Sequence, residues 1–129
     1  MFEFYKADDG RTEAIEYLPC SAITPKAGMA LMMSSGKLAI ATGTNAPTYI
    51  SLFNSDKAVT AGTMIPVSRV SKDVVYKTTN SASLASVNIG TKVTIATDGL
   101  RVTATATDGV AEVVGKDADA AGSDVYVRF

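Results

Sequence analysis

Apolar and polar residues alternate with a period of two along most of the chain, and no stretch shows the 3.6-residue apolar period of an amphipathic helix. The clearest alternation runs from Gly90 to Lys116, where three short stretches are separated by Asp98-Gly99 and Asp108-Gly109. Asp-Gly between alternating apolar residues indicates a two-residue hairpin, because both central positions of such a turn need positive φ. The pattern therefore predicts a β-meander in this segment.

Two-residue loops set the register of this meander. Ile95 then faces Val102, and Val93 faces Ala104. Ala104 in turn faces Val113 on the third strand, so these apolar side chains share one side of the sheet. Polar side chains occupy the other side: Lys92, Thr94, Thr103, Thr105 and Glu112. A register shifted by one residue would mix the two sets, so their separation favours this pairing.

Val110 and Val114 are exceptions, since they fall on the otherwise polar face of the meander. The hairpin expected over residues 29–42 is also apolar on both faces. Surplus apolar surface of this kind often marks an interface, although a sandwich core could absorb it. We therefore take Val110 and Val114 as candidate protein-binding residues.

Further strands are expected between clusters of turn residues. In the hairpin at 29–42, a Ser35-Gly36 loop places Met33 opposite Leu38 and Leu31 opposite Ile40. Pro66 indicates that its strand is an edge strand or only begins there, because proline lacks the backbone N–H. Other strands are expected at 48–53, 64–70, 73–78 and 124–129, and residues 79–86 are expected to form an exposed loop. The prediction is an all-β fold, as a small β-barrel or a β-tulip- or sandwich-like body.

Residues 1–19 are predicted to form an N-terminal hairpin or arm, and residues 20–129 a single all-β domain. Phe2, Phe4 and Tyr5 place three aromatic side chains in the first five residues. In one interpretation this segment is an edge strand, paired inside its own domain or with residues 13–18. In the other, it is an arm that docks on a neighbouring subunit or a larger assembly and buries its rings there.

Composition narrows the classes of function. A chain of 129 residues with 47% hydrophobic residues is expected to form one globular domain. The net charge of −1, without a basic run, argues against nucleic-acid binding. The single Cys20 cannot form an internal disulfide. Neither a signal peptide nor a membrane span is recognisable, so we expect a soluble protein made in the cytoplasm.

Candidate chemistry is sparse, and we expect neither catalysis nor a cofactor or small-molecule substrate. The chain has no histidine, which removes the commonest general base and metal ligand. Asp98 and Asp108 are expected to serve their turns rather than to act as an acid–base pair. Lys37 follows a turn, as the modified lysine of lipoyl and biotinyl carriers does, but lacks the flanking residues of those families. Cys20 is expected to be a small buried side chain.

A set of motifs spread over nearly the whole chain carries a resemblance to a known family. They lie at residues 22–31, 36–39, 47–51, 61–67, 90–100, 109–114 and 125–129. Each alone is a glycine turn or a valine-rich strand, but in this order they resemble the small capsid decoration, or cement, proteins of tailed bacteriophages and prophages.

The resemblance implies a small β-barrel or β-tulip-like body that binds the outside of an expanded icosahedral shell, commonly as a homotrimer at local three-fold positions. It implies the major capsid protein as partner, the virion exterior as location, and no catalytic residue. Two alternatives stay open. One is a β-sandwich binding module for a carbohydrate or cell-surface partner, although the chain has no tryptophan and only 7% aromatic residues. The other is a different phage component, such as a head fibre or tail tube.

Overall fold

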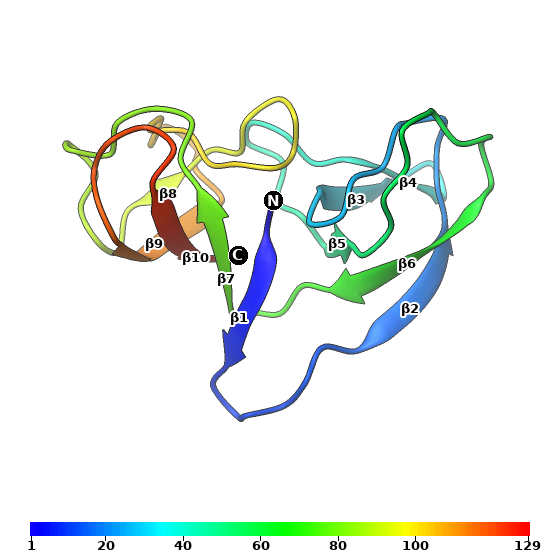
Figure 1. The fold of residues 1–129 in the computed structure, drawn as a ribbon, viewed down its shortest axis with the longest axis horizontal. Helices are drawn as coiled ribbons and strands as arrows, with labels where there is room; N and C mark the ends of the chain where they lie inside the picture. The colour runs from blue at the N-terminus through cyan, green and yellow to red at the C-terminus, as the bar shows by residue number, and fades with distance from the viewer.

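Ten β-strands and no helix make up the structure, a computed structural model that describes residues 1–129. The strands form two five-stranded sheets whose neighbouring strands are all antiparallel (Figure 1). Sheet A has the order β1 (Glu3–Ala7), β7 (Val74–Thr79), β10 (Asp124–Arg128), β9 (Ala111–Lys116) and β8 (Lys92–Val93). Sheet B has the order β2 (Ile15–Pro19), β6 (Met64–Arg69), β5 (Tyr49–Ser51), β3 (Ala30–Ser34) and β4 (Lys37–Ile40).

The predicted all-β class is confirmed, and the two sheets form a small sandwich rather than a closed barrel. Sheet B curls until its two ends approach each other. One isolated parallel bridge joins Cys20 to Leu38, and the Ser21 N–H donates to the Leu38 carbonyl at 2.9 Å. Because β2 and β4 share no further ladder, the edge of β2 stays open along most of its length.

The apolar side chains form two separate cores. The main core lies between the sheets and joins the inner residues of sheet A, such as Val113 and Val127, to Ala30 and Ile50 of sheet B. A second core lies on the other face of sheet B, inside its curl: Cys20, Met29, Leu31, Leu38, Tyr49, Ile65 and Val67. Sheet B is therefore apolar on both faces, which explains the two-sided apolar pattern of the 29–42 hairpin.

That hairpin has the predicted register. Met33 pairs with Leu38 and Leu31 pairs with Ile40. Ser35 and Gly36 form the loop with φ values of 49° and 76°, as a tight two-residue turn requires. Here the local turn signal was sufficient to predict the pairing.

The meander is only partly as predicted. At the first Asp-Gly turn Ile95 does pair with Val102, and the Gly99 N–H donates to the Ala96 carbonyl. Beyond it the prediction is wrong, because Val93 pairs with Ala111 instead of Ala104. Val113 likewise pairs with Val127 and not with Ala104.

Gly109 explains the different pairing. A Cβ at Gly109 would collide with the backbone of Lys92 and Val93, so only glycine allows this close approach. The chain after Gly109 can therefore lie directly beside β8, and the Val110 N–H donates to the Val93 carbonyl at 3.0 Å. The two Asp-Gly turns consequently differ in conformation, with positive φ at Gly99 in the first and at Asp108 in the second.

Two further expectations are corrected. The strand with Pro66 is not an edge strand, since β6 lies between β2 and β5. Pro66 is tolerated because its backbone faces β5 just where that strand has ended, and its carbonyl accepts from Leu52 at 3.0 Å. Residues 79–86 are not simply an exposed loop, because Leu84 is fully buried in the main core.

Residues 1–19 do not form a unit apart from the body. β1 pairs with β7 in sheet A, whereas β2 pairs with β6 in sheet B, so the first two strands do not pair with each other. The segment crosses from one sheet to the other through the loop at residues 8–14. Of the two interpretations of the N-terminus, the structure has the edge strand paired inside its own domain.

Candidate functional site

Two of the residues chosen as partner anchors belong to the core of this chain. Phe2 is only 2% exposed and packs edge-on against Phe129, with ring centroids 5.3 Å apart. Its N–H donates to the Gly28 carbonyl at 2.7 Å. Phe4 is half-buried against the main core. Both rings therefore serve the fold, and they are not free to anchor a partner.

The structure separates the two valines of the meander. Val110 is half-buried and packs against the main core. Val114 instead lies on the outer face of sheet A, where it lines a cavity of about 380 Å³ together with Tyr5 and Tyr126. The sequence did not place Tyr5 beside Val114, because the contact depends on the strand order of sheet A.

An apolar stripe crosses the outer face of sheet A from β1 to β9, and we define it as Tyr5, Val75, Tyr126 and Val114. The rings of Tyr5 and Tyr126 lie 4.9 Å apart at 58°. Val75 is buried although it belongs to neither core, so these rings cover it. Tyr5 reaches this position because β1 has an irregular register between Phe4 and Lys6.

Ion pairs border the stripe on both sides. Lys77 Nζ lies 2.9 Å from Asp124 Oδ2 at one border. At the other, Arg128 holds both carboxylate oxygens of Asp8, with Nη1 at 2.6 Å and Nη2 at 2.9 Å. The hydrogen bond from Arg128 lowers the pKa of Asp8 below its usual 3.8. The stripe is thus a small apolar surface with a charged rim, which suits a contact with another molecule.

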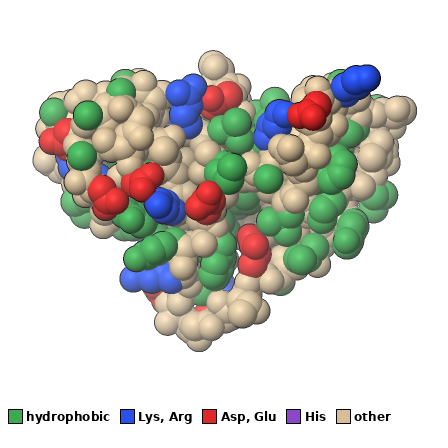
Figure 2. Space-filling view, in the orientation of Figure 1, with side chains coloured by type: hydrophobic (Ala, Val, Ile, Leu, Met, Phe, Trp, Pro, Cys, Tyr) green, Lys and Arg blue, Asp and Glu red, His purple; other side chains and the backbone are tan.

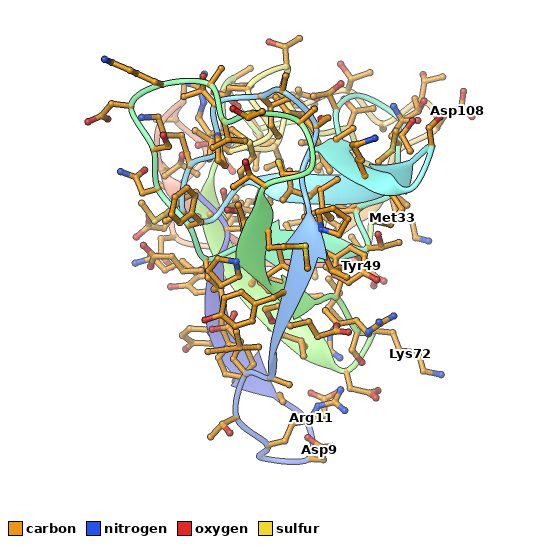
Figure 3. The ribbon with its side chains drawn as sticks, turned by 90° about the vertical axis from the view of Figure 1, so that its right-hand side faces the viewer. Asp9, Arg11, Met33, Tyr49, Lys72 and Asp108 are labelled. Atoms are coloured by element: carbon orange, nitrogen blue, oxygen red, sulfur yellow. The ribbon has the colours of Figure 1, made fainter.

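A second apolar surface lies on sheet B, at residues that were not among the candidates from the sequence. Ile15 is 61% exposed and Tyr17 64% exposed on β2, and Met64 on the adjacent β6 is 55% exposed. We call these three residues the β2 patch. Figure 2 shows hydrophobic side chains gathered over β2 and β6. Figure 3 shows the face on which β2 and β6 lie, with Asp9 and Arg11 in the loop at one end.

The β2 patch exists because the two sheets overlap only in part. Tyr17 pairs with Pro66 and Ile15 with Ser68, on the same face as Ile50 in the neighbouring strand. Ile50 is buried in the main core, but sheet A does not reach as far as β2. A signal was present in the sequence, because Ile15, Tyr17 and Leu18 put apolar residues on both faces of one short strand.

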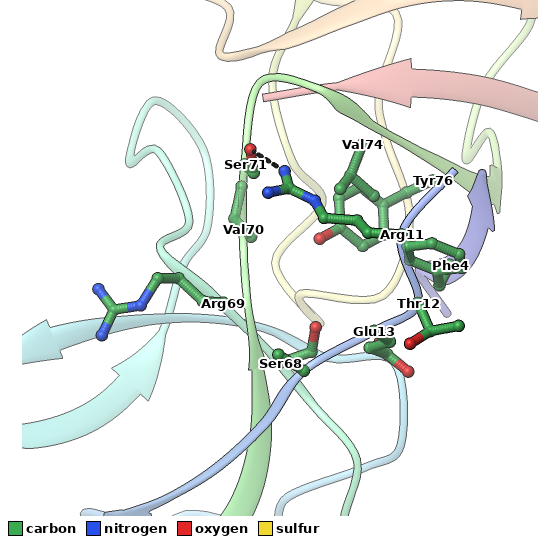
Figure 4. Close-up of a pocket in the computed structure, with 11 residues that line it drawn as sticks. Phe4, Arg11, Thr12, Glu13, Ser68, Arg69, Val70, Ser71, Val74 and Tyr76 are labelled. Carbon is green, nitrogen blue, oxygen red and sulfur yellow. Dashed lines mark hydrogen bonds between the residues drawn. The ribbon is translucent and has the colours of Figure 1, made fainter. Parts of the chain in front are cut away.

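A cavity of about 350 Å³ lies between the sheets, beneath the loop that joins β1 to β2. Arg11 crosses it and donates from Nη2 to Ser71 Oγ at 2.7 Å (Figure 4). The buried Tyr76 hydroxyl has no hydrogen-bond partner, and burial raises the pKa of Tyr76 to about 12.

The groups weighed for chemistry have structural surroundings. The Asp98 carboxylate accepts from the Leu100 N–H at 2.9 Å and from Arg101 Nε at 3.0 Å, inside its own turn. Cys20 is buried, which raises the pKa of its thiol. Lys37 is exposed at the end of the Ser35-Gly36 turn. No three His, Cys, Asp or Glu side chains lie together as metal ligands would, and the structure has no helix suited to crossing a membrane.

Comparison with known proteins assigns no family to the chain. No protein-family model matches the sequence, and no curated protein is significantly similar to it.

Proposed function

We propose that this chain is a non-enzymatic structural protein of a tailed-phage virion, which binds the outer surface of the capsid and stabilises it. The observation that carries the proposal is the pair of solvent-facing apolar surfaces, the stripe on sheet A and the β2 patch on sheet B. Two such surfaces on one small sandwich suit a protein that contacts more than one neighbour. The sequence motifs that resemble decoration proteins support the same role.

In this proposal the major capsid protein is the partner and the virion exterior is the location. A homotrimer at local three-fold positions would use one apolar surface between copies of the chain and the other against the shell. Several weak contacts repeated on a lattice add up, because each bound subunit raises the effective concentration for the next contact. The two small surfaces are compatible with a chain that is monomeric in solution and assembles on the particle.

Rebinding to purified particles tests this function. Particles are produced from the genome that encodes the chain after deletion of its gene, and labelled protein is then added back. We expect saturable binding at a fixed number of sites per shell, and a shell that withstands higher temperature after binding. The proposal would be contradicted if particles from the intact genome do not contain the protein, and if particles made without its gene do not bind the added protein.

One observation favours a second candidate, a binding module for a carbohydrate. Tyr5 and Tyr126 expose neighbouring rings beside a cavity of about 380 Å³ that Lys6 and Arg128 also line. Exposed rings can stack on sugar faces, and cationic side chains can bind acidic substituents. Titration of neutral and acidic oligosaccharides, followed by the NMR signals of the two tyrosine rings, tests this candidate. Oligosaccharides that shift the ring signals of Tyr5 and Tyr126, together with a failure of the protein to bind particles, would favour carbohydrate binding over capsid decoration.

A further inference from the structure

The backbone of β2 has one edge that this chain leaves unpaired. Tyr17 lies opposite Pro66, which has no N–H and whose carbonyl accepts from Leu52 on the β5 side, so this pair makes no hydrogen bond across the ladder. Alternation then directs the N–H and C=O groups of Glu16 and Leu18 toward β6, and those of Ile15 and Tyr17 away from it. The same alternation continues at Cys20, whose N–H donates to the carbonyl of Thr63, the residue before β6, at 2.8 Å.

The other end of this edge shows that its outward groups can bond to a strand. The Ser21 N–H, two positions beyond Pro19, donates outward to Leu38 at 2.9 Å. No such partner reaches Tyr17 or Ile15, and the backbone of residues 12–14 makes no hydrogen bond within the chain. The open edge therefore runs from Glu13 to Tyr17.

The remaining sheet edges are protected. β1 is irregular at Tyr5, which disrupts a regular row of donors and acceptors. Beyond β8, the chain at 94–96 pairs with residues 101–105, as in the bond from the Thr103 N–H to the Thr94 carbonyl. β4 is bound at its end by Ser21. Only the edge of β2 combines a regular row of free backbone groups with more than one large exposed apolar side chain.

We propose that the open edge of β2, residues 13–17, accepts an extended segment of the capsid partner as an additional strand of sheet B. The inference rests on the proposed function, and it names the surface and the type of contact. An extended polypeptide fits because its N–H and C=O groups repeat at the spacing of the outward groups of Ile15 and Tyr17. Its apolar side chains at alternate positions would cover the β2 patch.

Charge favours a different chain over a second copy of β2. Glu16 is held by Arg69, at 3.0 Å to Nε and 2.9 Å to Nη2, but Glu13 has no ion-pair partner. Alternation puts Glu13 on the face of Ile15 and Tyr17, so a second copy of β2 would add another unpaired Glu13 to that face instead of a cation. The complementary segment therefore carries a Lys or Arg opposite Glu13, and apolar residues opposite Ile15 and Tyr17.

The test compares two substitutions at one position, using the full chain and particles that lack it. Tyr17→Pro removes the outward N–H but no hydrogen bond to β6, whereas Tyr17→Thr removes the ring and keeps the N–H. We expect Tyr17→Pro to bind particles at least about tenfold more weakly than Tyr17→Thr, as expected for lost strand hydrogen bonds. Thermal melting verifies that both variants fold.

A second measurement needs no substitution and so remains decisive if Tyr17→Pro is unstable. Amide exchange on the wild-type chain should be fast at Ile15 and Tyr17 in solution and slow on the particle. Wild-type protein that fails to bind particles would overturn the proposed function itself. If the wild-type protein binds but these amides stay unprotected, strand addition alone is overturned. The same holds if Tyr17→Pro and Tyr17→Thr bind particles with equal affinity. Self-association in sedimentation that Tyr17→Pro abolishes would identify a second copy as the occupant and overturn the capsid segment.

Discussion

The first two strands of the chain, β1 and β2, are both edge strands, but they are protected in different ways. β1 follows the buried Phe2, has an irregular register at Tyr5, and is followed by Asp8, which Arg128 holds. β2 begins after a loop whose backbone at residues 12–14 makes no hydrogen bond, and it leaves Ile15 and Tyr17 exposed. The comparison indicates that β1 serves the stability of the fold, while β2 remains available for a partner.

The largest expected difference comes from removing one large side chain in each region. Phe2→Ala should lower the free energy of unfolding by about 3–5 kcal/mol, because a buried ring is replaced by a cavity. Tyr17→Ala should change it by no more than about 0.5 kcal/mol, because exposed side chains contribute little. Chemical denaturation of both variants measures the difference. Equal losses would contradict the assignment of β1 to the fold and β2 to a partner.

The next prediction concerns Gly28, which contacts the backbone of Phe2. Gly28 has a φ of +75°, and a Cβ there would lie 2.9 Å from the Phe2 nitrogen and 3.0 Å from its carbonyl oxygen. Gly28→Ala should therefore destabilise the protein by about 1–3 kcal/mol more than the left-handed conformation alone costs, and loosen the start of β1. Gly36→Ala is the matched control, because its φ is +76° but its surroundings are open. The control should lose only about 1–2 kcal/mol, the cost of the left-handed conformation.

Comparing the melting temperatures of Gly28→Ala and Gly36→Ala separates the destabilisation caused by the steric clash from that caused by the left-handed conformation. Faster amide exchange at Phe2 in Gly28→Ala alone would support the role of this contact. Identical melting temperatures would show that Gly28 does not hold the start of β1.

A smaller effect is expected from pH, because the stability of the β1 region should depend on the ionisation of Asp8 at its end. Because the pKa of Asp8 is lowered by Arg128, the ionised carboxylate stabilises the fold above the usual carboxyl pKa. This contribution is lost as the pH falls through the lowered pKa of the folded state. An NMR titration of the Asp8 carboxyl should give a midpoint below 3.8, and Arg128→Gln should return it toward 3.8. A normal Asp8 midpoint in the wild-type chain would show that the Asp8–Arg128 ion pair does not stabilise the end of β1.

Features set by neighbouring residues were predictable from the sequence. The 29–42 hairpin and the Ile95–Val102 pairing have the expected partners, because a short turn determines both. The pairing of Val93 with Ala111 was not predictable, because it depends on how closely the Gly109 backbone approaches Lys92. The sequence contains the glycine but not the position of the strand that passes it.

The candidate site divides in the same way. An aromatic N-terminus suggests an arm until Gly28 and Phe129 are known to receive Phe2. Tyr5 and Val114 were each selected for being apolar, and only the strand order of sheet A brings them to one cavity. The exposure of Ile15 and Tyr17 depends on how far sheet A extends over sheet B, which no local pattern records.

The central claim is that the chain binds a phage shell through the open edge of β2. The most direct measurement is a cryo-electron microscopy reconstruction of the particle at a resolution that separates strands. The account predicts this chain on the outer surface, in groups of three, with an extended capsid segment hydrogen-bonded to residues 13–17 as a sixth strand of sheet B. Density for the chain with β2 facing solvent, or a shell that carries no such chain, would contradict it.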